Sequence, residues 1–128
     1  DDLIRHANEL GVSVVEEILG NGLCGLYYRP RRLVVLDSRL LDVQRRCTLC
    51  HELIHAEWDD AGCMGGGKAE IRARRLTAEA LIDEDGYRRA EALYDEDAYE
   101  MACELNVTMQ VLCDYRSLCL SRRSRLAV

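Results

Sequence analysis

The sequence predicts a mostly helical α+β fold with a small N-terminal sheet, and three observations carry that prediction. Two β-prone runs flank a turn in the first third of the chain, helical periodicity dominates the remainder, and no repeat or low-complexity linker interrupts it. A length of 128 residues suits one domain and allows a buried core without disulfides. Because the chain has no Phe and one Trp, aliphatic residues must supply most of that core.

Composition excludes several classes of protein. The net charge of −6 argues against a general nucleic-acid or anionic-membrane binder, which usually carries positive charge. No apolar run approaches the length of a spanning helix, and the first residues do not resemble a signal peptide. Seven cysteines cannot all pair within one chain, so we expect reduced thiols in a cytoplasmic protein, with a disulfide scaffold as the alternative. Cys103 and Cys113 lie among apolar residues, which predicts that both are buried.

Two short helices are predicted at the N-terminus. Residues 2–10 have apolar positions at helical spacing, and Gly11 is a typical residue for ending a helix. Ser13 is a suitable cap for a second short helix over 14–19.

A hairpin is predicted next. Residues 23–28 and 33–36 are β-prone, and Arg29-Pro30-Arg31 between them is a turn signal. The run 33–36 is apolar on both faces, which is typical of a strand that is covered on both sides. We also expect this run to offer an edge to an extended peptide.

Two long helices follow, joined by a glycine-rich loop. The first is predicted over 42–58, which contains no Gly or Pro and has apolar residues at helical spacing. The loop over 59–67 includes three consecutive glycines, the most flexible stretch of the sequence. The second helix is predicted over 68–82, with an inner face formed by Ala69, Ala73, Leu76, Ala80 and Leu81.

The last part of the chain is predicted to be helical. Short helices are expected near 87–94, 96–105 and 108–119, and the basic residues 122–125 are expected to form a solvated terminus. The sequence therefore predicts one domain over 1–128, with a core over 1–83 and a helical portion over 84–128.

The first long helix contains His51-Glu52-Leu53-Ile54-His55, the pattern H-E-x-x-H. Histidines four residues apart project from one helix face about a turn apart, so both can reach a single Zn²⁺. Glu52 lies beside that face, where its carboxylate can take a proton from water that the ion activates. The alternative is a surface helix with two unrelated histidines. However, His51 and His55 lie where the helix is most apolar, so their face should be buried.

A catalytic zinc site needs a third protein ligand and one open position. Glu70 is the candidate we favour, because it opens the second long helix directly after the loop; the alternative is that it only interacts with the helix dipole. Asp59 is a rival on the same face as His55, although three ligands stacked along one straight helix lie too far apart. His6 is the only other histidine, and no pattern connects it to the site.

Two segments together resemble the ImmA/IrrE-type zinc metallo-endopeptidases. They are Arg46-Cys-Thr-Leu-Cys-His-Glu-Leu-Ile-His55 and Glu70-x-x-Ala73-x-x-Leu76-Thr-Ala-Glu-Ala-Leu-Ile82, and the resemblance extends over roughly residues 25–118. It implies a zincin-like fold around the H-E-x-x-H helix. It also implies the roles of four residues, with His51, His55 and Glu70 as zinc ligands and Glu52 as the general base.

The chain departs from the family pattern at several positions. Arg74 stands where the family often has Asn, Leu76 where it has Phe, and Asp83 where Pro is common. Small members of the family are often encoded by phages and mobile elements and cleave or inactivate a helix-turn-helix repressor. The resemblance therefore implies a repressor as the protein substrate, in the cytoplasm of a bacterial host.

The same residues allow other interpretations. Cys47-Thr-Leu-Cys50-His51 also matches the haem attachment pattern C-x-x-C-H, and a zinc site that uses Cys47 with His51 is a further alternative. The spacing over 98–112 is typical of a helix-turn-helix, but the second helix carries a single Arg, Arg116, whereas phosphate contacts need several basic residues.

The sequence thus favours a zinc-dependent endopeptidase that acts on a protein. The two alternatives are a non-catalytic protein that binds a repressor and a DNA-binding regulator. A non-catalytic protein with the same fold would have no need of Glu52.

Overall fold

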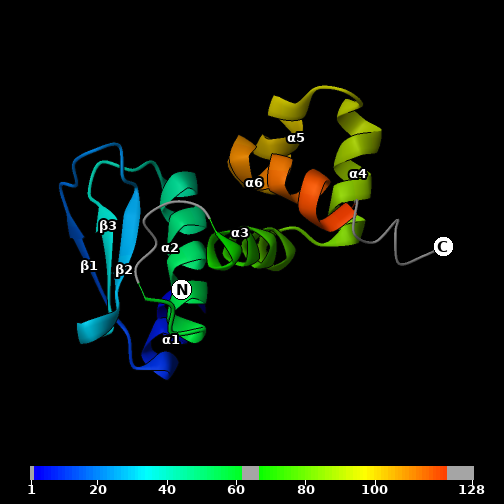
Figure 1. Cartoon of the computed structure of the whole chain (residues 1–128). Helices are drawn as coiled ribbons and strands as arrows, with labels where there is room; N and C mark the ends of the chain where they lie inside the picture. The colour runs from blue at the N-terminus through cyan, green and yellow to red at the C-terminus, as the bar shows by residue number, and fades with distance from the viewer. Residues whose placement is uncertain (1, 62–66, 121–128) are drawn as a thin grey trace. The chain divides into compact units, whose positions relative to one another are not determined.

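The computed structural model describes residues 2–61 and 67–120 (Figure 1). The chain forms two compact units, Asp1–Ala73 and Arg74–Val128. The first holds a sheet, two helices and the beginning of a third, and the second is helical, so the predicted mostly helical α+β class is confirmed. In the described residues, no helix is both long enough and apolar enough to cross a membrane.

The sheet has three strands in the order β1-β3-β2. Strand β2 (Gly25–Tyr28) pairs antiparallel with β3 (Leu33–Asp37), which confirms the predicted hairpin. Strand β1 (Ser13–Glu17) pairs parallel with β3, so the helix predicted over 14–19 is wrong. So short a segment cannot nucleate a helix by itself, and its β-branched valines favour the pairing that β3 offers.

Strand β3 is the centre of the sheet. Val34, Val35 and Leu36 are buried, as expected of a covered strand. Because β3 has a hydrogen-bonded neighbour on each side, the prediction that 33–36 offers an edge to a peptide is wrong. The edges of the sheet are β1 and β2.

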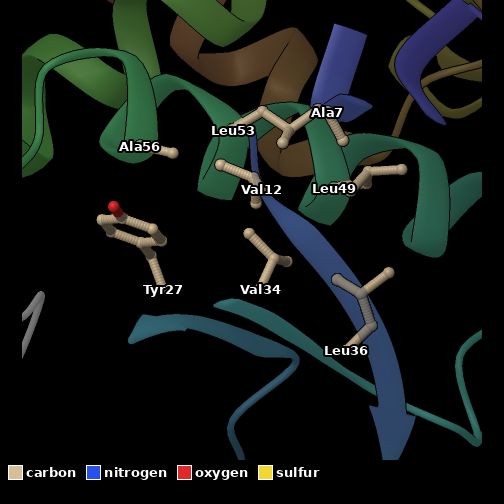
Figure 2. Close-up of a cluster of buried hydrophobic side chains, with 8 residues drawn as sticks. All are labelled: Ala7, Val12, Tyr27, Val34, Leu36, Leu49, Leu53 and Ala56. Atoms are coloured by element: carbon tan, nitrogen blue, oxygen red, sulfur yellow. The ribbon is translucent and has the colours of Figure 1, made fainter. Parts of the chain in front are cut away.

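Helix α2 (Asp42–Glu57) packs on the sheet and forms the core of the first unit. Figure 2 shows side chains of α2 facing those of the strands, and all of them are almost completely buried. Helix α1 (Asp2–Leu10) contributes to the same core and ends at Gly11, whose φ of 71° is left-handed, as predicted. The core consists of Ala7, Val12, Tyr27, Val34, Leu36, Leu49, Leu53 and Ala56.

The close approach of α2 to the sheet depends on Gly25. A Cβ atom at this position would lie 2.6 Å from Cγ2 of Thr48 on α2 and 3.1 Å from the carbonyl oxygen of Val35. Because neither backbone nor a methyl group can yield so much, only glycine fits here. Gly25 thus allows Thr48 of the H-E-x-x-H helix to lie close to β2.

Helix α3 (Lys68–Leu81) begins in the first unit and ends in the second. Ala73 on its inner face is buried as predicted, but Ala80 is exposed and the buried residues of the second half include Thr77 and Ala78. The prediction for Ala80 is therefore wrong.

The second unit continues with three helices and a final π-helical turn. They are α4 (Glu84–Tyr94), α5 (Ala98–Leu105), α6 (Met109–Asp114) and η2 (Tyr115–Leu120). Side chains of Asp83, Asp97 and Thr108 cap the three helices. The cap at Asp83 explains why α4 begins before the predicted residue 87.

The cysteines that the structure describes divide into buried and exposed thiols. Cys47 and Cys50 are buried, whereas Cys103 and Cys113 are exposed, so their predicted burial is wrong. Each lies among apolar neighbours in the sequence, but the helix turns its side chain outwards. The predictions for the first two glycines of the loop triplet and for residues 122–125 lie outside the described residues.

Candidate metal centre

Helix α2 brings the two histidines of the H-E-x-x-H pattern together. The Nε2 atoms of His51 and His55 lie 3.2 Å apart. The His55 side chain is completely buried and that of His51 is 19% exposed. The opposite face of the helix is anchored in the core by Leu49 and Leu53, so packing determines where the imidazoles point.

Glu70 of α3 completes the cluster. Its Oε1 atom lies 3.1 Å from Nε2 of His51 and 3.1 Å from Nε2 of His55. Among the described residues, these three side chains form a group that could hold a metal ion, with ligand atoms within 4.8 Å of one another. Hydrogen bonds with the two imidazoles hold the pKa of the Glu70 carboxyl well below its usual range, and the bond with His51 contributes most.

The three ligand atoms fit a zinc ion. Bonds of about 2.0–2.1 Å in a tetrahedral site separate the ligand atoms by roughly 3.3 Å. The observed separations of 3.1–3.2 Å are close to that value. Two imidazole nitrogens and one carboxylate oxygen are also the donor set of many catalytic zinc sites, which keep the fourth position open.

Glu52 lies on the same helix but outside the ligand cluster. It is 6% exposed, and within the described residues its Oε1 atom has no hydrogen-bond partner. Burial raises the pKa of its carboxyl, although the neighbouring imidazoles oppose this. A buried carboxylate with an unpartnered oxygen is costly to the fold, which points to a use other than stability.

The rival residues are engaged elsewhere. Asp59 accepts hydrogen bonds from Tyr27 and Arg29, and His6 contacts Glu57. Cys47 and Cys50 do not belong to the candidate metal group found in the described residues. The alternative sites at Cys47 and Cys50 therefore gain no support from the structure.

Sequence reasoning missed two residues at this centre. Asp60 accepts a hydrogen bond from Nδ1 of His55 at 2.9 Å, and Arg72 donates to both carboxylate oxygens of Asp60. Burial lowers the pKa of His55, but the hydrogen bonds with Glu70 and Asp60 outweigh it and leave the pKa raised. A carboxylate just after an H-E-x-x-H helix is the signal that could have identified Asp60, because ligating histidines commonly donate their second N–H to such a group.

The segment 98–112, whose spacing is typical of a helix-turn-helix, lies in the second unit. Helix α5 ends at Asn106 in the left-handed conformation, and α6 follows. Arg116, the single Arg of the segment proposed to read DNA, donates hydrogen bonds to the hydroxyl of Tyr87 and the sulfur of Met101. Its guanidinium is thus used in packing within this unit.

Searches of curated proteins and of solved structures gave no match. The family model of the IrrE N-terminal-like domain, Peptidase_M78, matches residues 7–115. That range includes the sheet, the three candidate ligands and Glu52. The chain therefore belongs to the IrrE N-terminal-like domain family, which supports a metallopeptidase and agrees with the resemblance noted in the sequence.

Proposed function

We propose that this chain is a zinc-dependent endopeptidase, with His51, His55 and Glu70 as the ligands of the ion and Glu52 as the general base. One observation carries the proposal: three ligand atoms from two helices converge within 4.8 Å of one another beside a buried carboxylate. Membership of a metallopeptidase family supports it.

Each side chain has a definite part in peptide hydrolysis. A bound zinc ion supplies a water of lowered pKa and polarises the substrate carbonyl. The Glu52 carboxylate accepts a proton from the attacking water and delivers it to the nitrogen of the leaving amine. Burial raises the pKa of Glu52, which suits a group that must first accept a proton and then release it.

The charge of the ligand set also suits this chemistry. Two neutral imidazoles and one carboxylate would leave a bound divalent ion with a net positive charge, which would favour the negative charge that develops on the carbonyl oxygen. Glu70 stays ionised at neutral pH, because its pKa is held low by the imidazoles.

The substrate we propose is a helix-turn-helix transcriptional repressor of a phage or mobile element, in the bacterial cytoplasm. This part of the proposal depends on the resemblance to the ImmA/IrrE-type enzymes and not on the geometry of the site. The competing proposal, a protein that binds the repressor without cleaving it, gives no reason for burying Glu52 with an unpartnered oxygen.

Metal analysis together with a cleavage assay tests the proposal. The purified protein is expected to bind one zinc ion per chain and to cleave the repressor encoded nearest its gene, with casein as a second probe. Chelation should abolish cleavage and added zinc should restore it.

Glu70→Ala distinguishes a ligand from a residue that interacts only with the helix dipole. We expect this variant to lose zinc, whereas the control Glu79→Ala, an exposed glutamate of the same helix, should retain it. Full zinc content in Glu70→Ala would exclude Glu70 as a ligand. A wild-type protein that binds no zinc would exclude the proposed centre altogether.

A further inference from the structure

The chain reverses directly after α2 and brings Asp60 back to His55. Asp59 has a φ of 50°, and this left-handed residue turns the backbone. The backbone N–H of Asp60 then donates to the carbonyl oxygen of His55 at 2.9 Å, and the Asp60 carboxylate accepts from Nδ1 of the His55 ring at 2.9 Å. Asp60 thus forms hydrogen bonds with His55 through both its main chain and its side chain.

Arg72 holds the Asp60 carboxylate from the other side. Its Nη2 atom lies 2.6 Å from Oδ1 and 2.7 Å from Oδ2 of Asp60. The guanidinium also lies over the ring of Trp58, 4.1 Å from its centroid. The two side chains of the ion pair are only 14% and 24% exposed, so water competes little for these bonds.

Arg72 and Glu70 are both in the first turns of α3. Helix α3 therefore places the third candidate ligand, Glu70, beside Nε2 of His55. Through Arg72, the same helix also holds Asp60 beside Nδ1 of His55. Both attachments lie within the first unit.

We propose that Asp60 and Arg72 are positioning residues of the metal centre, with Asp60 fixing the ring and tautomer of His55 and Arg72 holding Asp60 in place. The inference rests on the proposed zinc site. In the tautomer that Asp60 selects, Nδ1 carries the hydrogen and the lone pair of Nε2 faces Glu70. In the opposite tautomer a hydrogen would occupy the position of the ion.

Because His55 is buried, a protein group must orient its ring at Nδ1. An exposed imidazole can take its second hydrogen bond from water, but the His55 side chain is completely buried. Its ring can be oriented only by the protein groups that contact it, which at Nδ1 is Asp60.

Asp59 provides a matched control for Asp60. It is the preceding residue and also pairs with arginine, since Arg29 donates to its carboxylate at 3.1 Å. Its bonds lead to Tyr27 and Arg29 of the hairpin region rather than to a candidate ligand, and its side chain is 50% exposed. The two variants therefore remove the same group from neighbouring positions.

The first experiment measures zinc affinity by competition with a chromophoric chelator. We expect Asp60→Ala to weaken zinc binding about 10–100-fold and Arg72→Ala to weaken it in the same direction. Asp59→Gly, which removes the same carboxylate and suits the left-handed backbone at this residue, should stay within about threefold of wild type. Arg72→Ala added to Asp60→Ala should have little further effect, because Arg72 acts through Asp60.

The second experiment reads the His55 tautomer directly. The chain has three histidines, so ¹⁵N spectra of the imidazoles can be assigned by substitution. In metal-free protein at a pH where His55 is neutral, wild type should show hydrogen on Nδ1, where Asp60 accepts it at 2.9 Å. In Asp60→Ala the hydrogen should move towards Nε2, where Glu70 remains as an acceptor at 3.1 Å. Asp60→Asn, whose carbonyl oxygen still accepts from Nδ1, should restore the wild-type tautomer. The fluorescence of the single Trp58 reports whether the turn at Asp59 keeps its conformation.

The outcomes separate the two proposals. Wild-type zinc affinity in Asp60→Ala, or an unchanged His55 tautomer, would overturn the positioning role even if the enzyme is active. Failure of the wild-type protein to bind zinc would reject the metal centre, and the tautomer measurement needs no metal and still decides what Asp60 does.

Discussion

Two buried carboxylates, Glu52 in the first unit and Asp114 in the second, have nearly the same exposure and opposite surroundings. Asp114 is 3% exposed and accepts hydrogen bonds from Arg74 at 2.6 Å and 3.1 Å and from Gln110 at 3.0 Å. Glu52 is 6% exposed, and one of its oxygens has no partner in the described residues.

This contrast distinguishes a structural carboxylate from a functional one. A buried charge that is paired and hydrogen-bonded costs the fold little to retain, whereas an unpartnered one is costly. Asp114 therefore has a sufficient explanation in the packing of its own unit, and Glu52 has none in the packing of α2.

Glu52→Gln is expected to have the largest effect on activity. It removes the proton acceptor but keeps the size of the side chain, so cleavage should fall by about 10²–10⁴-fold while zinc content is unchanged. Burial raises the pKa of Glu52, so the ionised form destabilises the fold at neutral pH, and its removal should not lower the free energy of unfolding. Assays of cleavage, zinc content and urea unfolding on the same preparation check all three points.

Glu57→Gln, an exposed glutamate of the same helix, is the control for this substitution. Cleavage at the wild-type rate by Glu52→Gln would reject the role of general base. Loss of cleavage with intact repression-relieving activity in cells would instead favour the non-catalytic, repressor-binding alternative.

Asp114→Asn should show the reverse pattern. The carboxylate loses its charge and its bidentate pairing with Arg74, so the free energy of unfolding should fall by about 2 kcal/mol. Zinc affinity should not change, because Asp114 and its partners Arg74 and Gln110 belong to the second unit, whereas the candidate ligands belong to the first. Urea unfolding of the metal-free protein and chelator competition measure the two quantities, and a weakened zinc affinity would contradict the contrast with Glu52.

The sequence predicts the role of Glu52 but not the pairing of Asp114. The role of Glu52 was predicted because H-E-x-x-H is a local pattern on one helix, and the pairing of Glu70 with it needed only the following helix. Asp114 and Arg74 are 40 residues apart, and no local pattern connects them. Arg72 and Asp60 were missed for the same reason. Their contacts with each other and with His55 depend on a turn at Asp59 that only the folded backbone reveals.

The fold shows the same division between local and non-local information. Helices α2 and α3 and the β2–β3 hairpin followed from local periodicity and turn chemistry. Strand β1 was predicted to be a helix because its preference is set by pairing with β3, twenty residues further along the chain. Cys103 and Cys113 were placed in the core because apolar neighbours in sequence do not determine which face of a helix is turned inwards.

Zinc affinity should depend on pH through His55. The pKa of its imidazole is raised by Glu70 and Asp60 despite burial, and only the neutral ring can bind a metal. Affinity should therefore fall up to about tenfold per pH unit below that raised pKa, and stay level with respect to this group above it. Glu70 stays ionised throughout and adds no step.

Chelator competition between about pH 5 and 8 measures this dependence. In Asp60→Asn, the hydrogen bond by which Asp60 raises the pKa of His55 loses its charged acceptor, so the step should move to lower pH. An identical profile in that variant would show that Asp60 does not influence His55 electrostatically.

We expect the smallest effect on the free energy of unfolding from Glu79→Gln. This substitution tests whether burial, rather than pairing with arginine, determines the cost of altering a carboxylate. Glu79 pairs with Arg75 on the same helix at 3.4 Å, but its side chain is 36% exposed. A single exposed pair of this spacing contributes about 0.3–0.5 kcal/mol, so the free energy of unfolding should fall by no more than that, with no change in zinc binding or cleavage. If urea unfolding instead showed a loss as large as that of Asp114→Asn, pairing with arginine would matter more than burial. The unpartnered oxygen of Glu52 would then be a weaker indication of function, because the contrast assumes that burial makes an unsatisfied carboxylate costly.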